Sequence, residues 1–114
     1  MESILTSIKK LLGIAEDYDH FDVDLIIHIN TVLMGLTQMG VGPTEGYMIT
    51  SSFNTWDQFI DEDKNLAAVK SYVYLKVKLL FDPPLGSAHI ETINRAISEL
   101  EWRLNIEAES ASSV

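Results

Sequence analysis

Acidic residues and histidines are the side chains of this sequence that could hold a metal ion or move a proton. Between Glu16 and Asp24 the stretch EDYDHFDVD carries five acids and no base. A calcium loop of the EF-hand type needs spaced acids, then a glycine, then a closing glutamate. With Asp17 in the first position, the glycine position is Asp22 and the closing position is His28. The acidic run therefore does not match a calcium loop.

The three histidines do not complete a catalytic or metal-binding pattern. Asp24 and His28 fall one helical turn apart and could share a metal, but nothing supplies a defined third ligand, so a solvated ion pair is the stronger interpretation. His20 and His89 add no partner. The sequence has no cysteine, no glycine-rich phosphate loop and no Ser–His–Asp pattern. We therefore predict no enzymatic activity, no bound metal and no other cofactor.

Size and charge restrict the class of protein further. At 114 residues, 46% of them hydrophobic, the chain has the length and composition of one globular domain. Seventeen acids against eight bases give a formal charge of −9, which disfavours a conventional DNA-binding domain. No apolar run reaches the roughly 18 residues of a membrane span. The N-terminal segment also lacks the pattern of a signal peptide, so we expect no membrane association.

Four segments repeat apolar residues at helical spacing, which predicts four helices. These helices must position any functional residue. We expect Asp22 to cap the second helix and Ser87 to cap the fourth. The second helix is apolar around nearly its whole circumference, which predicts burial by more than one neighbour. The sequence therefore predicts a mainly all-α fold, a single four-helix domain over residues 1–108 with a short polar tail at 109–114. The predicted helices span residues 3–12, 23–38, 63–81 and 87–108.

Between residues 40 and 63 the helical period is lost. The stretch GVGPTEG has loop chemistry, and YMITSSF has the β-branched and aromatic residues of a short strand. TWDQFI indicates one turn of helix capped by Thr55. We predict an irregular or short β-hairpin segment around residues 40–60. A connection this long is often held by its own side chains, and we predict Phe53, Trp56 and Phe59 as that clamp.

A helix-breaking segment separates the third and fourth predicted helices. Asp82 precedes a proline and is forced out of helical geometry, and the consecutive Pro83 and Pro84 impose a stiff extended step. Gly86 then permits a sharp bend. We predict that Phe81, Asp82, Pro83 and Pro84 form a rigid joint. Such a joint fixes the angle between the two longest helices, as is needed when helices present surfaces to neighbours in register.

The last helix has a large aromatic residue opposite its core-facing side. Trp102, with Arg95 and Ile106, lies about 180° from the apolar seam. Trp102 is buried either by residues 40–63 of the same chain or by another chain. Tryptophan and arginine are enriched at protein contacts, so Trp102, Arg95, Ile106 and Arg103 form a candidate subunit or partner contact. The apolar seam consists of Ile90, Ile93, Ile97, Leu100 and Leu104.

Two stretches together resemble the tailed-phage head–tail connector family of head-completion or adaptor proteins. They are VYLKVKLLFDPP and INRAISELEWRLN. The upstream TSSFNTWDQFI, with Trp56, resembles the middle segment of that family. The resemblance covers most of the chain and is strongest over residues 66–105. The matching residues are Phe81, Asp82, Pro83 and Pro84, followed by Glu99, Leu100, Glu101, Trp102, Arg103, Leu104 and Asn105.

This resemblance implies a structural protein of the virion neck, made in the host cytoplasm. Its subunits would form a homo-oligomeric ring, a dodecamer in the virion, between the portal protein and a tail-side neck or stopper protein. DNA would pass through the lumen without sequence-specific binding, and an acidic channel wall suits that passage. The C-terminal tail is short, so any docking arm formed by it would be small.

Two other functions stay open on the residues alone. A monomeric helical adaptor could bind one partner protein through the Trp102 side of the last helix. An acidic protein could also act as a DNA mimic that occupies a basic cleft on a host protein. The oligomeric mass in solution separates the first alternative from a ring.

Overall fold

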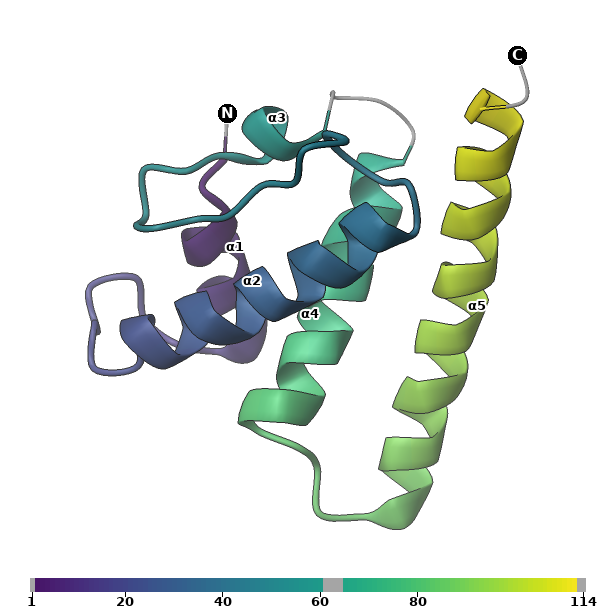
Figure 1. Cartoon of the computed structure of the whole chain (residues 1–114). Coiled ribbons are helices and arrows are strands. Elements are labelled where there is room, and N and C mark those ends of the chain that lie inside the picture. The colour runs from purple at the N-terminus through teal and green to yellow at the C-terminus, as the bar shows by residue number, and fades with distance from the viewer. Residues whose placement is uncertain (1, 61–64, 113–114) are drawn as a thin grey trace.

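Helix α4 (Leu66–Phe81) is the element against which the other long helices pack. The computed structural model describes residues 2–60 and 65–112. In Figure 1, α1 (Ile4–Leu12) and the short α3 (Trp56–Phe59) lie to the left of α4, α2 (Asp22–Gln38) crosses in front of it, and α5 (Ser87–Ser112) lies to its right. The mainly all-α fold predicted from the sequence is confirmed.

Helix α1 begins and ends at capping residues. The hydroxyl of Ser3 accepts a hydrogen bond from the backbone N–H of Thr6 at 3.2 Å, which satisfies one free donor of the first turn. At the other end Gly13 adopts a left-handed conformation with φ 82°, and its N–H bonds back to the last turn. Between the caps, Ile4 and Ile8 are fully buried.

Helix α2 has a buried face and an exposed face, and its start corrects one expectation. The helix begins at Asp22, and Phe21 occupies the N-cap position without a side-chain bond, so Asp22 is not the cap. Leu25, Ile29 and Leu36 face the core, but the apolar residues on the outer side are uncovered. Within the described residues α2 packs on two neighbours, α1 and α4, as expected, but these cover only part of its circumference and leave an apolar outer face exposed.

The segment between α2 and α4 is irregular and not a hairpin. Its β pairing among the described residues is one isolated bridge between Ser3 and Thr55. The predicted strand is absent because the side-chain amide of Asn30 takes the place of a partner strand. Its oxygen accepts from the backbone N–H of Ile49 at 2.8 Å, and its nitrogen donates to the backbone carbonyl of Ile49 at 2.9 Å. The predicted helical turn is confirmed as α3, with a capping box formed by Thr55 and Gln58.

A close approach of backbone and ring fixes the start of this segment. Gly42 has φ 85°, and a Cβ atom added to it would lie 2.6 Å from the ring of Phe59. Both facts require glycine at this position. Phe59 is thereby packed into the core together with Ile49.

The two C-terminal helices differ from their predicted limits. Helix α4 is described from Leu66, and the predicted start at residue 63 lies outside the described residues. Helix α5 continues to Ser112, beyond the predicted end at Ala108. No helix in the described part of the chain is long and apolar enough to cross a membrane.

Candidate interaction surfaces

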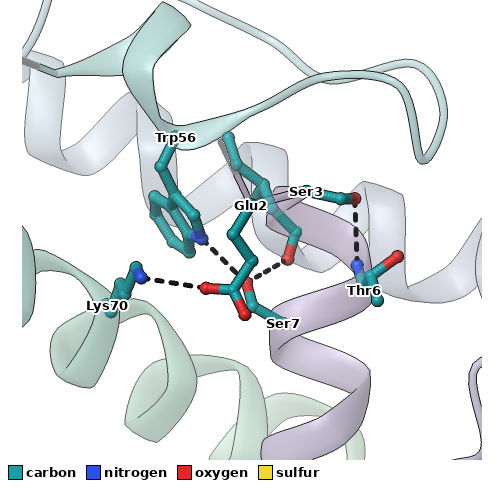
Figure 2. A network of polar contacts seen from close by, with 7 residues as sticks. Glu2, Ser3, Thr6, Ser7, Trp56 and Lys70 are labelled. Atoms are coloured by element: carbon teal, nitrogen blue, oxygen red, sulfur yellow. Dashed lines mark hydrogen bonds and ion pairs between the residues drawn. The ribbon is translucent and has the colours of Figure 1, made fainter.

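Trp56 fastens the irregular segment to two helices (Figure 2). Its indole Nε1–H donates to the hydroxyl of Ser7 on α1 at 2.7 Å, and both side chains are buried. The ammonium of Lys70 on α4 lies 5.9 Å from the centre of the indole ring and 2.9 Å from a carboxylate oxygen of Glu2. A cation over an aromatic face adds a modest attraction. The segment is thus held to α1 and α4 at one point.

Of the three aromatic residues predicted to clamp the segment, Trp56 and Phe59 are buried and Phe53 is not. Phe53 is 86% exposed, so its prediction as a clamp was wrong. The turn around it is closed by polar groups instead: the side chain of Asn54 accepts from the backbone N–H of Thr50 at 2.8 Å, and Ser51 accepts from the N–H of Phe53 at 3.1 Å. These local bonds leave Phe53 at the tip of the turn, in solvent.

The predicted stop after the third long helix lies where the sequence places it. Helix α4 ends at Phe81, and Asp82 has φ −147° and ψ 67°, outside helical geometry. The Phe81 ring packs edge-on against Phe21, with centroids 5.2 Å apart, and the ammonium of Lys78 lies 3.3 Å from the Asp82 carboxylate. Pro83 is exposed and Pro84 is half-buried.

The residues after the prolines correct one further expectation. The N–H of Ile90 bonds to the carbonyl of Gly86 at 3.1 Å, so Gly86 precedes the first helical residue and Ser87 lies inside the helix, not at its cap. The expected bend is present at residues 85–86, and Gly86 makes it without a positive φ. The chain turns there because proline ends one helix and the next begins at once.

Helix α5 is attached to the rest of the fold along one side. Ile97 and Leu104 are buried, and Ile93 and Leu100 pack partly against the same core. The hydroxyl of Tyr72 on α4 donates to a carboxylate oxygen of Glu101 at 2.8 Å. Burial and this carboxylate raise the pKa of Tyr72, so the phenol stays protonated and keeps the bond.

The opposite side of α5 is uncovered, and we call it the Trp102 surface: Arg95, Trp102, Arg103 and Ile106. Trp102 is 65% exposed and Ile106 is 41% exposed, so residues 40–60 do not bury them. The guanidinium of Arg103 lies 2.7 Å from the carboxylate of Glu99 in an exposed pair, which contributes little stability. A shallow groove of about 370 Å³ separates Trp102 and Ile106 from the start of α4.

A second uncovered apolar surface was missed from the sequence, and we call it the α2 surface: Val23, Ile27, Met34 and Met48. Val23 is 71% exposed and Met48 is 66% exposed. Between α2 and the segment that follows it runs a groove of about 540 Å³. At 100° per residue, Val23, Ile27 and Met34 fall together and away from the buried face of α2, and this spacing is the signal that could have identified the surface. The groove is lined by Asn30, Thr31, Met34, Thr37, Glu45, Gly46, Tyr47 and Met48.

The acidic run is an exposed loop, and Lys9 contacts residues at both of its ends. The ammonium of Lys9, itself 2% exposed, lies 2.9 Å from a carboxylate oxygen of Asp22 and donates to the carbonyl of Glu16 at 3.0 Å. A buried ammonium needs such partners. Across residues 2–60 and 65–112, no three His, Asp or Glu side chains are placed to hold a metal ion. The exposed acids therefore form a charged surface.

Comparison with known proteins gives one match. A family model described as "Phage connector protein" matches residues 4–111, from the first residue of α1 almost to the end of α5. No curated protein matches the chain, and no solved structure does. The matched range includes both uncovered surfaces and the stop between α4 and α5.

Proposed function

Because the chain belongs to the phage connector protein family, we propose that it is one subunit of the ring that joins the head of a phage to its tail. The family supports a structural role in the phage neck. The observation that carries the proposal is the extent of the match, residues 4–111 of a chain of 114. The proposal includes the ring itself and its dodecameric state. It also includes the two neighbours of the ring, the portal protein and a tail-side neck or stopper protein.

The surfaces of the subunit support a role in assembly. Single apolar side chains are common on protein surfaces, but clusters of them mark contacts. The Trp102 surface combines an isoleucine with an exposed tryptophan and two arginines, and tryptophan and arginine are enriched in protein interfaces. We propose that it is buried against a neighbouring subunit or partner in the neck.

The stop between α4 and α5 supports the same role. Residues 82–84 do not continue a helix, and the ring of Phe81 is packed against that of Phe21, the residue before α2. We propose that Phe81, Asp82, Pro83 and Pro84 hold α5 at a fixed angle to α4. Subunits in a ring must repeat one geometry at every contact, and a stiff joint provides it.

The charge of the subunit suits a wall that DNA passes. The net charge is −9, and Glu16, Asp17 and Asp19 are exposed on the loop before α2. We propose that acids of residues 16–24 or 57–63 face the lumen, where like charge keeps DNA from binding. Asp57 is exposed, and residues 61–63 lie outside the described part of the chain. The family match favours this role over the monomeric adaptor and the DNA mimic.

Removal of the protein from an infected cell tests this function. Phage that lack it should fill heads with DNA but fail to join tails, so that tailless heads accumulate, and the wild-type gene supplied in trans should restore infectivity. Electron microscopy counts the tailless heads, and antibody labelling of complete particles should locate the protein at the neck. Normal tailed particles without the protein, or labelling elsewhere in the virion, would contradict the proposal.

A further inference from the structure

The Trp102 surface and the α2 surface belong to two different helices that both pack on α4. In Figure 1, α2 crosses in front of α4 and α5 stands to the right of it. The principal contacts of α5 are with α4, and α2 packs on α1 and α4. Neither surface covers the other within one chain, since Val23 and Trp102 are both largely exposed. A subunit with two unlike contact surfaces can bind two further copies of itself, head to tail.

The two surfaces agree in length. The apolar residues of the α2 surface run from Val23 to Met34, and the Trp102 surface runs from Arg95 to Ile106. Each covers eleven helical steps, which is roughly 16 Å at about 1.5 Å per residue. Two helices laid along each other could therefore cover the helical part of both surfaces.

The chemistry of the groove suits a tryptophan. Met34 and Met48 border the groove, and both are largely exposed. Methionine is flexible, and its sulfur makes favourable contacts with aromatic rings, so the two side chains can adapt to a flat indole. The groove of about 540 Å³ is large enough to admit one aromatic side chain. Trp102 is the exposed tryptophan of the chain, whereas Trp56 is buried.

Charges at the two surfaces are opposite. Both arginines of the sequence, Arg95 and Arg103, lie on the Trp102 surface. At the rim of the groove Glu45 is exposed, and its carboxylate accepts only a long bond of 3.3 Å from Thr44 among the contacts described. Two copies that each carry −9 repel one another, so a contact between them is favoured where bases meet acids. Arg103, which is adjacent to Trp102 in the sequence, can meet Glu45 in this way.

We propose that the Trp102 surface of one subunit docks on the α2 surface of a second copy of this chain, with Trp102 in the groove beside Met34 and Met48. The proposal rests on the proposed function, because a ring requires contact between copies. It adds which two surfaces meet, and it makes the contact heterologous: each subunit offers one surface to the copy on one side and the other surface to the copy on the other side.

Cysteine crosslinking in assembled particles tests the pairing. The chain has no cysteine, so introduced thiols are the only ones it carries. The double variant Met48→Cys, Ile106→Cys places one exposed thiol on each surface and keeps Trp102. A short bismaleimide should convert it into a ladder of covalent multimers beyond the dimer. Each single variant, which has only one of the two surfaces labelled, should stay monomeric under the same conditions.

A matched control is the double variant Leu85→Cys, Ile106→Cys, because Leu85 is fully exposed but belongs to neither surface. It should give at least tenfold less multimer than Met48→Cys, Ile106→Cys. Dimers from a single variant would mean that a surface meets its own copy, which overturns the proposal. Crosslinks only to a different protein, or no crosslinks, would overturn it too.

These results are separable from a failure of the proposed function. If the wild-type protein is absent from the neck of purified particles, the proposed function fails. If the protein is present in the neck and the double variant gives no ladder, the proposed function stands and only the pairing of the two surfaces is wrong.

Discussion

The two tryptophans of the chain lie in regions that differ in how far they are buried. Trp56 is fully buried among α1, α4 and the irregular segment, and its indole N–H is bonded to Ser7. Trp102 stands on the outer side of α5, mostly in solvent. One tryptophan thus completes the core between α1, α4 and the irregular segment, and the other is exposed to solvent on the last helix.

The difference follows from the number of neighbours that each helix has. Helix α4 packs against α1, α2 and α5, so apolar residues on several of its sides are buried. Helix α5 packs mainly against α4 and buries only the side that carries Ile97 and Leu104. Large apolar residues on the other side cost solubility and add no stability to the single chain. We propose that a contact with another chain explains their presence.

The largest expected effect on stability is that of Trp56→Ala. The change removes a fully buried indole and leaves the Ser7 hydroxyl without its donor, so the free energy of unfolding should fall by about 3–5 kcal/mol. Urea unfolding followed by circular dichroism measures the loss. Trp56→Phe is the control, since it keeps most of the apolar volume and should cost less. A loss below about 1 kcal/mol for the alanine variant would show that the segment is not held through Trp56.

A smaller effect on stability is expected when both prolines of the joint are replaced by alanine. Each proline restricts the unfolded chain, so Pro83→Ala with Pro84→Ala should lower the free energy of unfolding by about 1–2 kcal/mol in total. The helix content should change little, but the angle of α5 would no longer be fixed and joining of heads to tails should be impaired. Circular dichroism and the titre of infectious particles measure the two effects. A parental titre would contradict the rigid joint.

Much of the fold could be predicted from the sequence because it rests on local periodicity and on helix breakers. The stop at Phe81 and the turn capped by Thr55 both follow from short stretches. The strand prediction failed because β-branched residues near Ile49 have the composition of a strand, whereas the bonds from Asn30 come from a distant part of the chain. Propensity gives no account of such a partner.

The interaction surfaces were predictable only in part. The position of Trp102 opposite the apolar seam followed from helical spacing, and the structure places it outside the single-chain core. The α2 surface was missed because an apolar helix has the same sequence whether one neighbour covers it or two. Phe53 was misjudged for a similar reason, since the polar bonds of its turn, not the size of the ring, decide where it lies.

The smallest expected effect on stability, and the most direct test of the difference between the two regions, is that of Trp102→Ala. Because Trp102 is largely exposed, the free energy of unfolding of the isolated protein should change by less than about 0.5 kcal/mol. A buried aromatic anchor in an interface contributes about 2 kcal/mol or more, so each contact should weaken by roughly thirtyfold.

The measurement compares urea unfolding of purified Trp102→Ala with its incorporation into phage particles, both relative to wild type. We predict unchanged unfolding and a loss of incorporation of tenfold or more. Loss of about 3 kcal/mol or more of stability, with normal incorporation of the molecules that do fold, would place Trp102 in the core and contradict its role as an assembly contact.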